Sequence, residues 1–236
     1  MFICVDYDNL PREHRHKGPK YVVERVLRSI GTRSFSADNR AKVRLYGGWY
    51  DCSNPTRRCQ KLSGELQASF PGVIPVTDQS GAVPVRVAAE LAYSLAADPH
   101  RHLFHTFRRR GMPQGLRCDD PGNHGCVDSS CPLKSLPHFI NQGKCPKQGC
   151  SVRPEDLLYR NQQKLVDTML SADVIHYATS GVSELCIVSS DDDFWPAIRS
   201  ALLAGAQVIH VHTKPRHTTP AAYCRGVGPD YVQNSL

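Results

Sequence analysis

The sequence predicts an α/β protein with a mostly parallel sheet flanked by helices. Two short apolar runs of strand length, at 2–6 and 185–189, each end abruptly in carboxylates. Such runs are typical of parallel strands that are buried on both faces. Segments with helical periodicity alternate with further runs of strand length along the chain, which is the order expected when helices connect parallel strands.

The individual elements follow from local patterns. A helix at 20–30 carries its apolar residues at helical spacing and ends at Gly31. The segment 83–95 is ambiguous, because its valines alternate as in a strand before a run of alanines favours a helix. The longest helical pattern covers 155–178. The remaining expected elements are strands at 42–47, 73–76 and 207–211 and helices at 60–69 and about 194–204.

The alternation of strand and helix patterns is interrupted between 110 and 153, where Gly, Pro and Cys dominate and no apolar periodicity remains. A segment that cannot build a core needs another source of order. We therefore expect a discontinuous α/β domain over 1–109 and 154–214, interrupted by a Cys-rich insertion at 110–153. The segment 215–236, with three prolines, is expected to be irregular.

Four cysteines of the insertion form two pairs with the same spacing, and structural zinc takes four N or S ligands from such short-spaced pairs. The expected zinc ligands are Cys126, Cys131, Cys145 and Cys150, with Cys118, His124 or His138 as substitutes. The alternative is burial as small apolar residues, which the lack of a hydrophobic pattern disfavours. Cys4 and Cys186 lie inside apolar strands and are expected in the core, and Cys52 and Cys59 are expected to be ordinary thiols.

Charge and cysteine content bear on partners and compartment. The formal net charge is +7, and cationic residues crowd into 12–20, 100–117 and 210–225. This distribution suits a polyanionic partner such as RNA, with a merely solvated basic surface as the alternative. The expected RNA contacts are Arg108, Arg109, Arg110 and Arg117. No stretch approaches the roughly 18 apolar residues of a membrane span, and Met1 leads directly into a strand, so we expect a cytoplasmic protein with reduced thiols and no membrane partner.

The acidic residues predict a metal site. If the strands at 2–6 and 185–189 are neighbours, Asp6 and Asp191 meet at one edge of the sheet, where carboxylates repel unless a cation such as Mg²⁺ bridges them. On a helical wheel, Asp173 falls in the middle of the apolar arc of the 155–178 pattern and Asp167 at its edge. Buried carboxylates need a metal, a cap or a cationic partner, so pairing of Asp173 with an arginine is the alternative.

Three ordered motifs resemble the NYN domains of the PIN-like nuclease superfamily, whose members are mostly metal-dependent ribonucleases. The matching segments are Asp6-Tyr7-Asp8-Asn9 after the first strand, Lys164-Leu165-Val166-Asp167 with Asp173 on the central helix, and Ser189-Ser190-Asp191-Asp192-Asp193-Phe194 after the later strand. The chain departs from the family pattern at Ser190, which replaces the usual glycine, and at the additional carboxylate of Asp192. The resemblance covers 2–9 and 160–212 well and does not cover the cysteine insertion.

The resemblance implies a Rossmann-like PIN fold and an endoribonuclease that cuts structured RNA. It implies that Asp6, Asp167 and Asp191, helped by Asp193, hold one or two Mg²⁺ or Mn²⁺ ions. Asn9 is expected to orient Asp6 or the nucleophile, Lys164 to steady the acids or meet a phosphate, and Asp8 and Asp173 to support the site.

Two other functions fit parts of the sequence. Haloacid-dehalogenase-type phosphatases also carry Asp-x-Asp after the first strand. However, that family has Thr or Val at the position of Asn9, and its mechanism would leave Asp167 without a function. A non-catalytic RNA-binding or adaptor protein, stabilised by zinc, would need the basic patches but not the acids of all three motifs.

Overall fold

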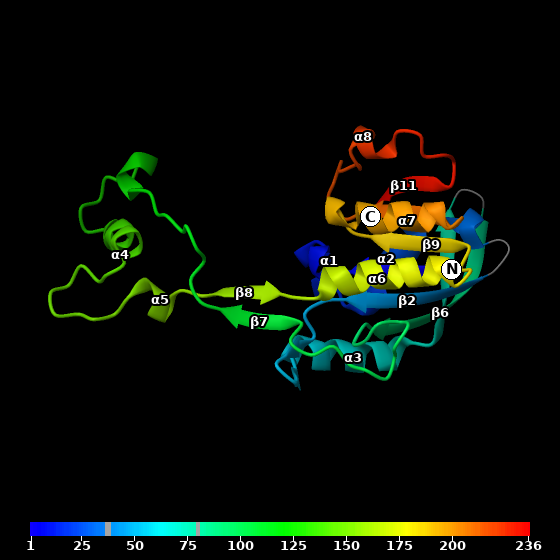
Figure 1. The fold of residues 1–236 in the computed structure, drawn as a ribbon, viewed down its shortest axis with the longest axis horizontal. Helices are drawn as coiled ribbons and strands as arrows, with labels where there is room; N and C mark the ends of the chain where they lie inside the picture. The colour runs from blue at the N-terminus through cyan, green and yellow to red at the C-terminus, as the bar shows by residue number, and fades with distance from the viewer. Residues whose placement is uncertain (36–38, 79–80) are drawn as a thin grey trace. The chain divides into compact units, whose positions relative to one another are not determined.

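The computed structural model of the protein describes residues 1–35, 39–78 and 81–236, except for the side chains of residues 108–110 and 161. The chain divides into two compact units (Figure 1). The first combines Met1–Thr106 with Gln163–Leu236, and the second is Phe107–Gln162. The expected insertion at 110–153 lies within the second unit.

The first unit contains a seven-stranded sheet with the order β11-β10-β9-β1-β2-β6-β5. All neighbouring strands are parallel except β5, which runs antiparallel to β6 at one edge. The strands of this sheet are β1 (Phe2–Asp6), β2 (Arg40–Tyr46), β5 (Gly72–Asp78), β6 (Gly81–Leu91), β9 (Glu184–Val188), β10 (Gln207–His212) and β11 (Tyr231–Ser235). The short strands β3 (Tyr50–Asp51) and β4 (Asn54–Pro55) pair with each other in an antiparallel hairpin. The α/β class with a mostly parallel sheet is therefore confirmed.

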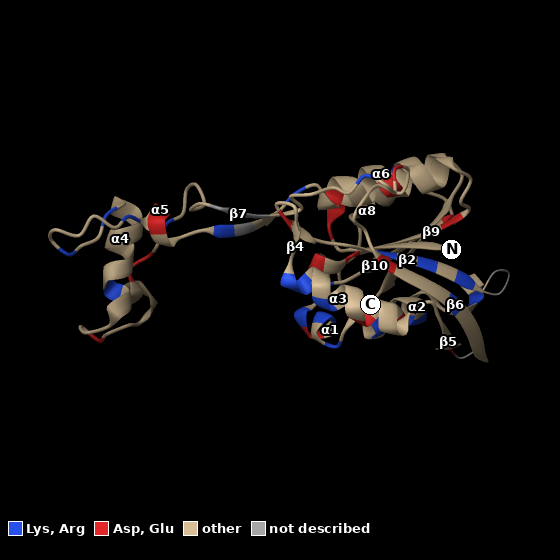
Figure 2. Cartoon of the chain, turned by 90° about the horizontal axis from the view of Figure 1, so that it is seen from below, with Lys and Arg blue, Asp and Glu red and all other residues tan. Residues whose placement is uncertain are grey.

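Helices cover both faces of the sheet, and alternate strand residues feed two separate cores (Figures 1 and 2). Ile3 and Val5 of β1 lie in the core beneath α2 and α3, whereas Cys4 faces the core beneath α6 and α7. The helices of this unit are α1 (Arg12–His16), α2 (Pro19–Ile30), α3 (Arg57–Ser69), α6 (Val166–Thr179), α7 (Trp195–Leu203) and α8 (Ala221–Cys224). Short 3-10 helices cover Tyr7–Asn9, Thr32–Phe35 and Asp192–Phe194. Cys4 and Cys186 are buried, as expected.

β1 and β9 are direct neighbours in the centre of the sheet. Their register pairs Phe2 with Leu185 and Val5 with Val188, so the two strands end side by side. The condition on which the predicted acid site depended is therefore met. Residues separated by some 180 positions in the chain come together because strands 2–6 and 184–188 are parallel and in register.

The expected long helix at 155–178 is wrong in its first half. This segment contains α5 (Pro154–Leu157) and β8 (Arg160–Gln163), and α6 begins only at Val166. Leu165 has a left-handed backbone conformation, with φ of 67°, which a continuous right-handed helix does not allow. Leu165 falls within the expected helix, yet it is 45% exposed. The apolar face of the real helix starts one residue later.

Two further segments differ from expectation. The ambiguous segment 83–95 is strand up to Leu91, because Ala89 and Leu91 continue the inward alternation begun by the valines. The segment 215–236 is not irregular throughout, since it contains α8 and the edge strand β11. β11 pairs in parallel with β10 although its residues Tyr231–Ser235 lack an apolar run. An edge strand has only one neighbour and needs little apolar sequence, so periodicity does not reveal it.

The second unit has little buried side-chain area. Its elements are β7 (Phe107–Arg110), α4 (Leu136–Gln142) and α5, with 3-10 helices at Pro121–His124 and Pro132–Ser135 and with β8 at its end. Pro154 is its only residue classed as buried among those whose side chains are described. Across the described part of the whole chain, no helix combines the length and the apolar character that a membrane crossing requires.

Candidate active site

The end of β1 places Asp6 in the interior. Asp6 is only 5% exposed, and its side chain caps the 3-10 helix that follows, accepting a hydrogen bond of 3.3 Å from the backbone N–H of Asn9. Its second carboxylate oxygen, Oδ2, accepts a hydrogen bond of 2.9 Å from the hydroxyl of Ser189, at the end of β9. The Asp-x-x-Asn spacing of the first motif is therefore a capping turn that holds the carboxylate in one orientation.

Ser189 connects the two strand ends. Its hydroxyl oxygen accepts a hydrogen bond of 3.1 Å from the backbone N–H of Asp191 while the same hydroxyl donates to Asp6. Asp191 in turn caps the 3-10 helix Asp192–Phe194, since its Oδ1 accepts from the backbone N–H of Asp193 at 3.1 Å. Sequence reasoning missed this serine, whose only signal is its position between a buried strand and a carboxylate.

The acids of the three motifs act on one another electrostatically. Burial raises the pKa of Asp6 to about 7. The hydrogen bond from Ser189 lowers this pKa, whereas the negative charges of Asp167 and Asp8 raise it further. Partial desolvation also raises the pKa of Asp167, in the first turn of α6, and the charges of Asp191 and Asp193 come next among the causes. The charges of these acids therefore interact beyond the ends of β1 and β9, where the hydroxyl of Ser189 connects Asp6 with the turn of Asp191.

Asp8 differs from the other acids because cations already neutralise it. Arg58 of α3 binds both oxygens of the Asp8 carboxylate, with 2.9 Å between Nη2 and Oδ2. Arg15 of α1 lies 3.5 Å away, and the backbone N–H of Gly48 donates to Oδ2 at 3.1 Å. A carboxylate held in this way is a structural anchor and a poor metal ligand, which agrees with its expected supporting place.

Asn9 joins the site through its side chain as well as its backbone. Its Oδ1 accepts hydrogen bonds from the backbone N–H of Ser190 at 3.2 Å and from the hydroxyl of Thr213 at 2.6 Å. Ser190 occupies the position at which the family pattern has glycine, and its hydroxyl accepts from the backbone N–H groups of Thr213 and Lys214 at 2.8 and 2.9 Å. Ser190 and Thr213 were not among the predicted residues, and together with Asn9 they connect the ends of β1, β9 and β10.

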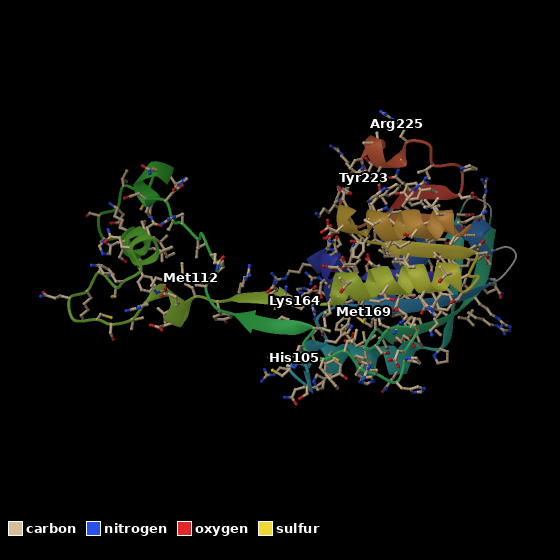
Figure 3. The ribbon with its side chains drawn as sticks, in the orientation of Figure 1. His105, Met112, Lys164, Met169, Tyr223 and Arg225 are labelled. Atoms are coloured by element: carbon tan, nitrogen blue, oxygen red, sulfur yellow. The ribbon has the colours of Figure 1, made fainter. Side chains whose placement is uncertain are left out.

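Asp173 does not belong to the acid cluster. Its carboxylate pairs with Arg44 at 2.6 Å and accepts hydrogen bonds from Tyr46 at 2.8 Å and from the backbone N–H of Ala96 at 2.7 Å. Asp173 was expected only to support the site, and the alternative of pairing with an arginine is what the structure shows. Lys164 precedes α6 with an exposed side chain, and Figure 3 shows it ahead of Met169, which lies inside the helix.

The carboxylate set has the right chemistry for a hard divalent cation. Asp6 has lost much of its hydration and is surrounded by like charges, and no cation contacts it among the described ion pairs. A bound divalent ion would offset that repulsion. In the described residues, no three His, Cys, Asp or Glu side chains already converge on one point as a metal site. The fit is therefore one of charge and donor type, with side-chain adjustment needed for coordination.

The predicted zinc ligands are only partly brought together. The thiol of Cys131 is the main influence that raises the pKa of Cys126, so these two side chains lie near each other. Cys145 and Cys150 do not complete a group of three with them among the described side chains. Of the substitutes, Cys118 pairs through its backbone with Asn141, His124 lies 3.5 Å from Asp119, and His138 is half-buried. All ten cysteines, each within the described ranges, are free.

The expected RNA-binding arginines belong to the second unit. The side chains of Arg108, Arg109 and Arg110 lie outside those that the structure describes, and Arg117 is exposed.

The chain was compared with protein-family models, curated proteins and solved structures, and none of them matches. The chemistry of the site is therefore inferred from the positions and charges of its own residues.

Proposed function

We propose that this protein is a metal-dependent endoribonuclease of the NYN type within the PIN-like superfamily. The observation that carries the proposal is the hydroxyl of Ser189, which connects Asp6 at the end of β1 with the turn of Asp191 at the end of β9. Ligands bind at this edge of open α/β sheets. Asp167 and Asp193 add their charge to the same place.

In this proposal Asp6, Asp167 and Asp191, with Asp193, hold Mg²⁺ or Mn²⁺. A divalent ion there lowers the pKa of a bound water and offsets charge on the phosphoryl oxygens. Asn9 and Ser189 act as positioning residues, because their hydrogen bonds orient Asp6 and the turn of Asp191. The exposed Lys164, at the start of α6, is available to a phosphate of the substrate.

RNA is the proposed substrate because the protein is basic around an acidic site. The net charge of +7 favours a polyanion, whereas the clustered carboxylates would repel one without a metal. Arg108, Arg109, Arg110 and Arg117 remain the proposed contacts to structured RNA from the second unit. The nearness of the Cys126 and Cys131 thiols supports a structural zinc ion in that unit, with Cys145 and Cys150 as the other two proposed ligands. The free state of all ten cysteines agrees with a cytoplasmic location.

The geometry disfavours the phosphatase alternative. An Asp-x-Asp phosphatase uses both acids of its first motif, but Arg58 and Arg15 already occupy the carboxylate of Asp8. Nothing in the geometry of the site specifically favours a non-catalytic RNA-binding protein, and this alternative becomes one outcome of the experiment.

The test is cleavage of end-labelled structured RNA by the purified protein in Mg²⁺ or Mn²⁺, with EDTA as the metal-free condition. We expect cleavage that EDTA stops, and a loss of at least about 100-fold in the Asp6→Asn and Asp191→Asn variants. Asp98→Asn removes an exposed carboxylate outside the cluster and should cleave normally. RNA binding without cleavage by the wild type would establish the adaptor alternative, and hydrolysis of p-nitrophenyl phosphate without RNA cleavage would establish the phosphatase.

A further inference from the structure

A cationic cleft of about 510 Å³ lies between α1 and α3. Four of its lining residues carry positive charge, namely Arg12 and Arg15 from α1 and Arg58 and Lys61 from α3. Glu65 is the only carboxylate in its lining, and Tyr7 and Leu62 form part of its wall. Figure 2 shows the Lys and Arg segments of α1 and of the first turns of α3 in blue on the same side of the first unit. This concentration of cations is independent of the arginines of the second unit.

Two of these cations are held rigidly. The guanidinium of Arg58 binds Asp8 with both Nη atoms and lies over the ring of the buried Trp49, 5.4 Å from its centroid. The guanidinium of Arg15 lies 3.5 Å from the same carboxylate, and its Nε is buried without a hydrogen-bond partner. The side chains of Arg58 and Arg15 nevertheless remain 36% and 29% exposed, so both can meet a ligand. Fixed guanidinium groups lose little entropy when they bind an anion.

The other two cations are free to close on a ligand. The side chain of Lys61 is 72% exposed, and its printed ion pair is a loose one with Glu65, at 3.7 Å. Arg12 is exposed, and its Nε donates to His16 at 3.4 Å. The four cations together face one lining carboxylate plus Asp8, which leaves the cleft positively charged. The planar guanidinium groups of arginine and the compact ammonium group of lysine both bind phosphate oxygens well.

The cleft borders the acid cluster through Asp8. Asp8 follows Asp6 by two residues, and its charge acts on both Asp6 and Asp167. It also anchors the two rigid arginines of the cleft. When one phosphate of an RNA strand lies at the acid cluster, a neighbouring phosphate of the same strand can therefore reach the cleft.

We propose that this cleft binds a phosphate of the RNA strand next to the one that is cut, and so fixes the register of cleavage. The inference rests on the proposed nuclease function for the role of that phosphate, but the binding itself needs neither metal nor catalysis. The phosphate has two sources, an internal phosphodiester or a 5′-terminal monophosphate, and both present the same oxygens to the four cations.

The test measures binding without cleavage. Fluorescence anisotropy in EDTA, with the Asp191→Asn background, compares a labelled single-stranded oligoribonucleotide that ends in a 5′-phosphate with one that ends in a 5′-hydroxyl. The Arg12→Ala/Lys61→Ala variant should bind at least about 10-fold more weakly, and its dependence of log K on log salt should be flatter by about 0.7, as for one lost phosphate contact. The matched control is Arg28→Ala/Arg199→Ala, which removes two exposed cations of α2 and α7.

The outcomes separate the possibilities. A loss confined to the 5′-phosphate oligonucleotide identifies a terminal phosphate, and an equal loss for both identifies an internal phosphodiester. Unchanged affinity and salt dependence relative to the control variant would overturn the proposal, provided that circular dichroism shows both variants folded. If RNA binds through the cleft but the wild type does not cleave it in Mg²⁺ or Mn²⁺, the phosphate site stands and the nuclease function fails. If the wild type cleaves RNA and the Arg12→Ala/Lys61→Ala variant binds RNA as tightly as the wild type, the nuclease function stands and the phosphate site fails.

Discussion

Arg44 and Asp173 form a buried ion pair, with 2.6 Å between Nη1 and Oδ2 and with 4% and 1% of the two residues exposed. Arg44 belongs to β2 and Asp173 to α6, so the pair fastens the helix that carries Asp167 to the sheet. Burial raises the pKa of Asp173, while Ala96, Tyr46 and Arg44 oppose the rise. The second acid of the helix motif thus positions the first one instead of joining it at a metal.

Removal of either partner of the Arg44–Asp173 pair should lower the stability of the fold strongly, because it leaves an uncompensated charge in the interior. We expect Asp173→Leu to lower the free energy of unfolding by about 3–5 kcal/mol in urea titrations. Arg44→Met/Asp173→Leu, which removes both charges, should recover part of that loss. The loose pair Lys61–Glu65, whose side chains are 72% and 35% exposed, provides the control, where Glu65→Ala should cost less than about 1 kcal/mol. Equal costs at the two pairs would show that the buried pair does not anchor α6.

Divalent metal should stabilise the fold through the acid cluster. Because the ion binds the native carboxylates and not the unfolded chain, the melting temperature should rise with Mg²⁺ or Mn²⁺ concentration. The stabilisation reaches about 2.7 kcal/mol at 100 times the dissociation constant. The rise should disappear in Asp167→Asn and Asp191→Asn and persist in Asp98→Asn, as measured by differential scanning fluorimetry. A metal-dependent shift of the same size in Asp191→Asn would place the ion elsewhere.

Zinc should bind the second unit. We expect about one zinc per chain in protein prepared with zinc, measured by atomic emission, because the four thiolates complete a tetrahedral set. Cys126→Ser/Cys145→Ser should lose the ion, and proteolysis should then cut within 107–162. Cys52→Ser, in the first unit and exposed, should retain full zinc content. Retention of zinc by the double variant would refute these ligands.

Acid should destabilise the protein through His210. Burial lowers the pKa of His210 to about 3, and the neighbouring His212 contributes next. Its Nε2 donates to the carbonyl of Ser189 at 3.0 Å, and its Nδ1 accepts from Tyr231 at 2.9 Å, so both ring nitrogens are satisfied in the neutral form. The unfolded chain binds the proton near pH 6.5 and the folded one does not, so stability is lost as the pH falls below about 6.5.

The measurement is urea unfolding between pH 7 and pH 4.5. The contribution of His210 reaches about 1.4 kcal/mol per pH unit well below pH 6.5, and His210→Gln should show a shallower decline by up to this slope. His100→Gln changes an exposed histidine and should follow the wild type. Parallel curves for wild type and His210→Gln would mean that His210 can be protonated in the folded state.

Much of the site can be predicted from short segments. Asp6 and Asp191 were predicted because each follows an apolar strand, and Asp167 because it lies at the edge of an apolar helical arc within a family motif. The charge of Asp167 acts on Asp6, and that of Asp191 acts on Asp167. The partner of Asp173 was left open because a helical wheel shows that a carboxylate is buried but not which side chain faces it. The start of the helix was misplaced because the left-handed turn at Leu165 has no compositional signal.

The α/β order of elements and the acids that end the strands can be recognised from the sequence, because periodicity and strand length are properties of adjacent residues. That β1 and β9 are neighbours, and that Ser189 connects their acids, is visible only in the folded chain. The same is true of the neutralisation of Asp173 by Arg44 and of Asp8 by Arg58 and Arg15. Apart from the pair of Arg15 and Asp8 and the local bond between Ser189 and Asp191, these contacts join residues at least 50 positions apart, and their partners follow from strand order and helix packing, which no local pattern encodes.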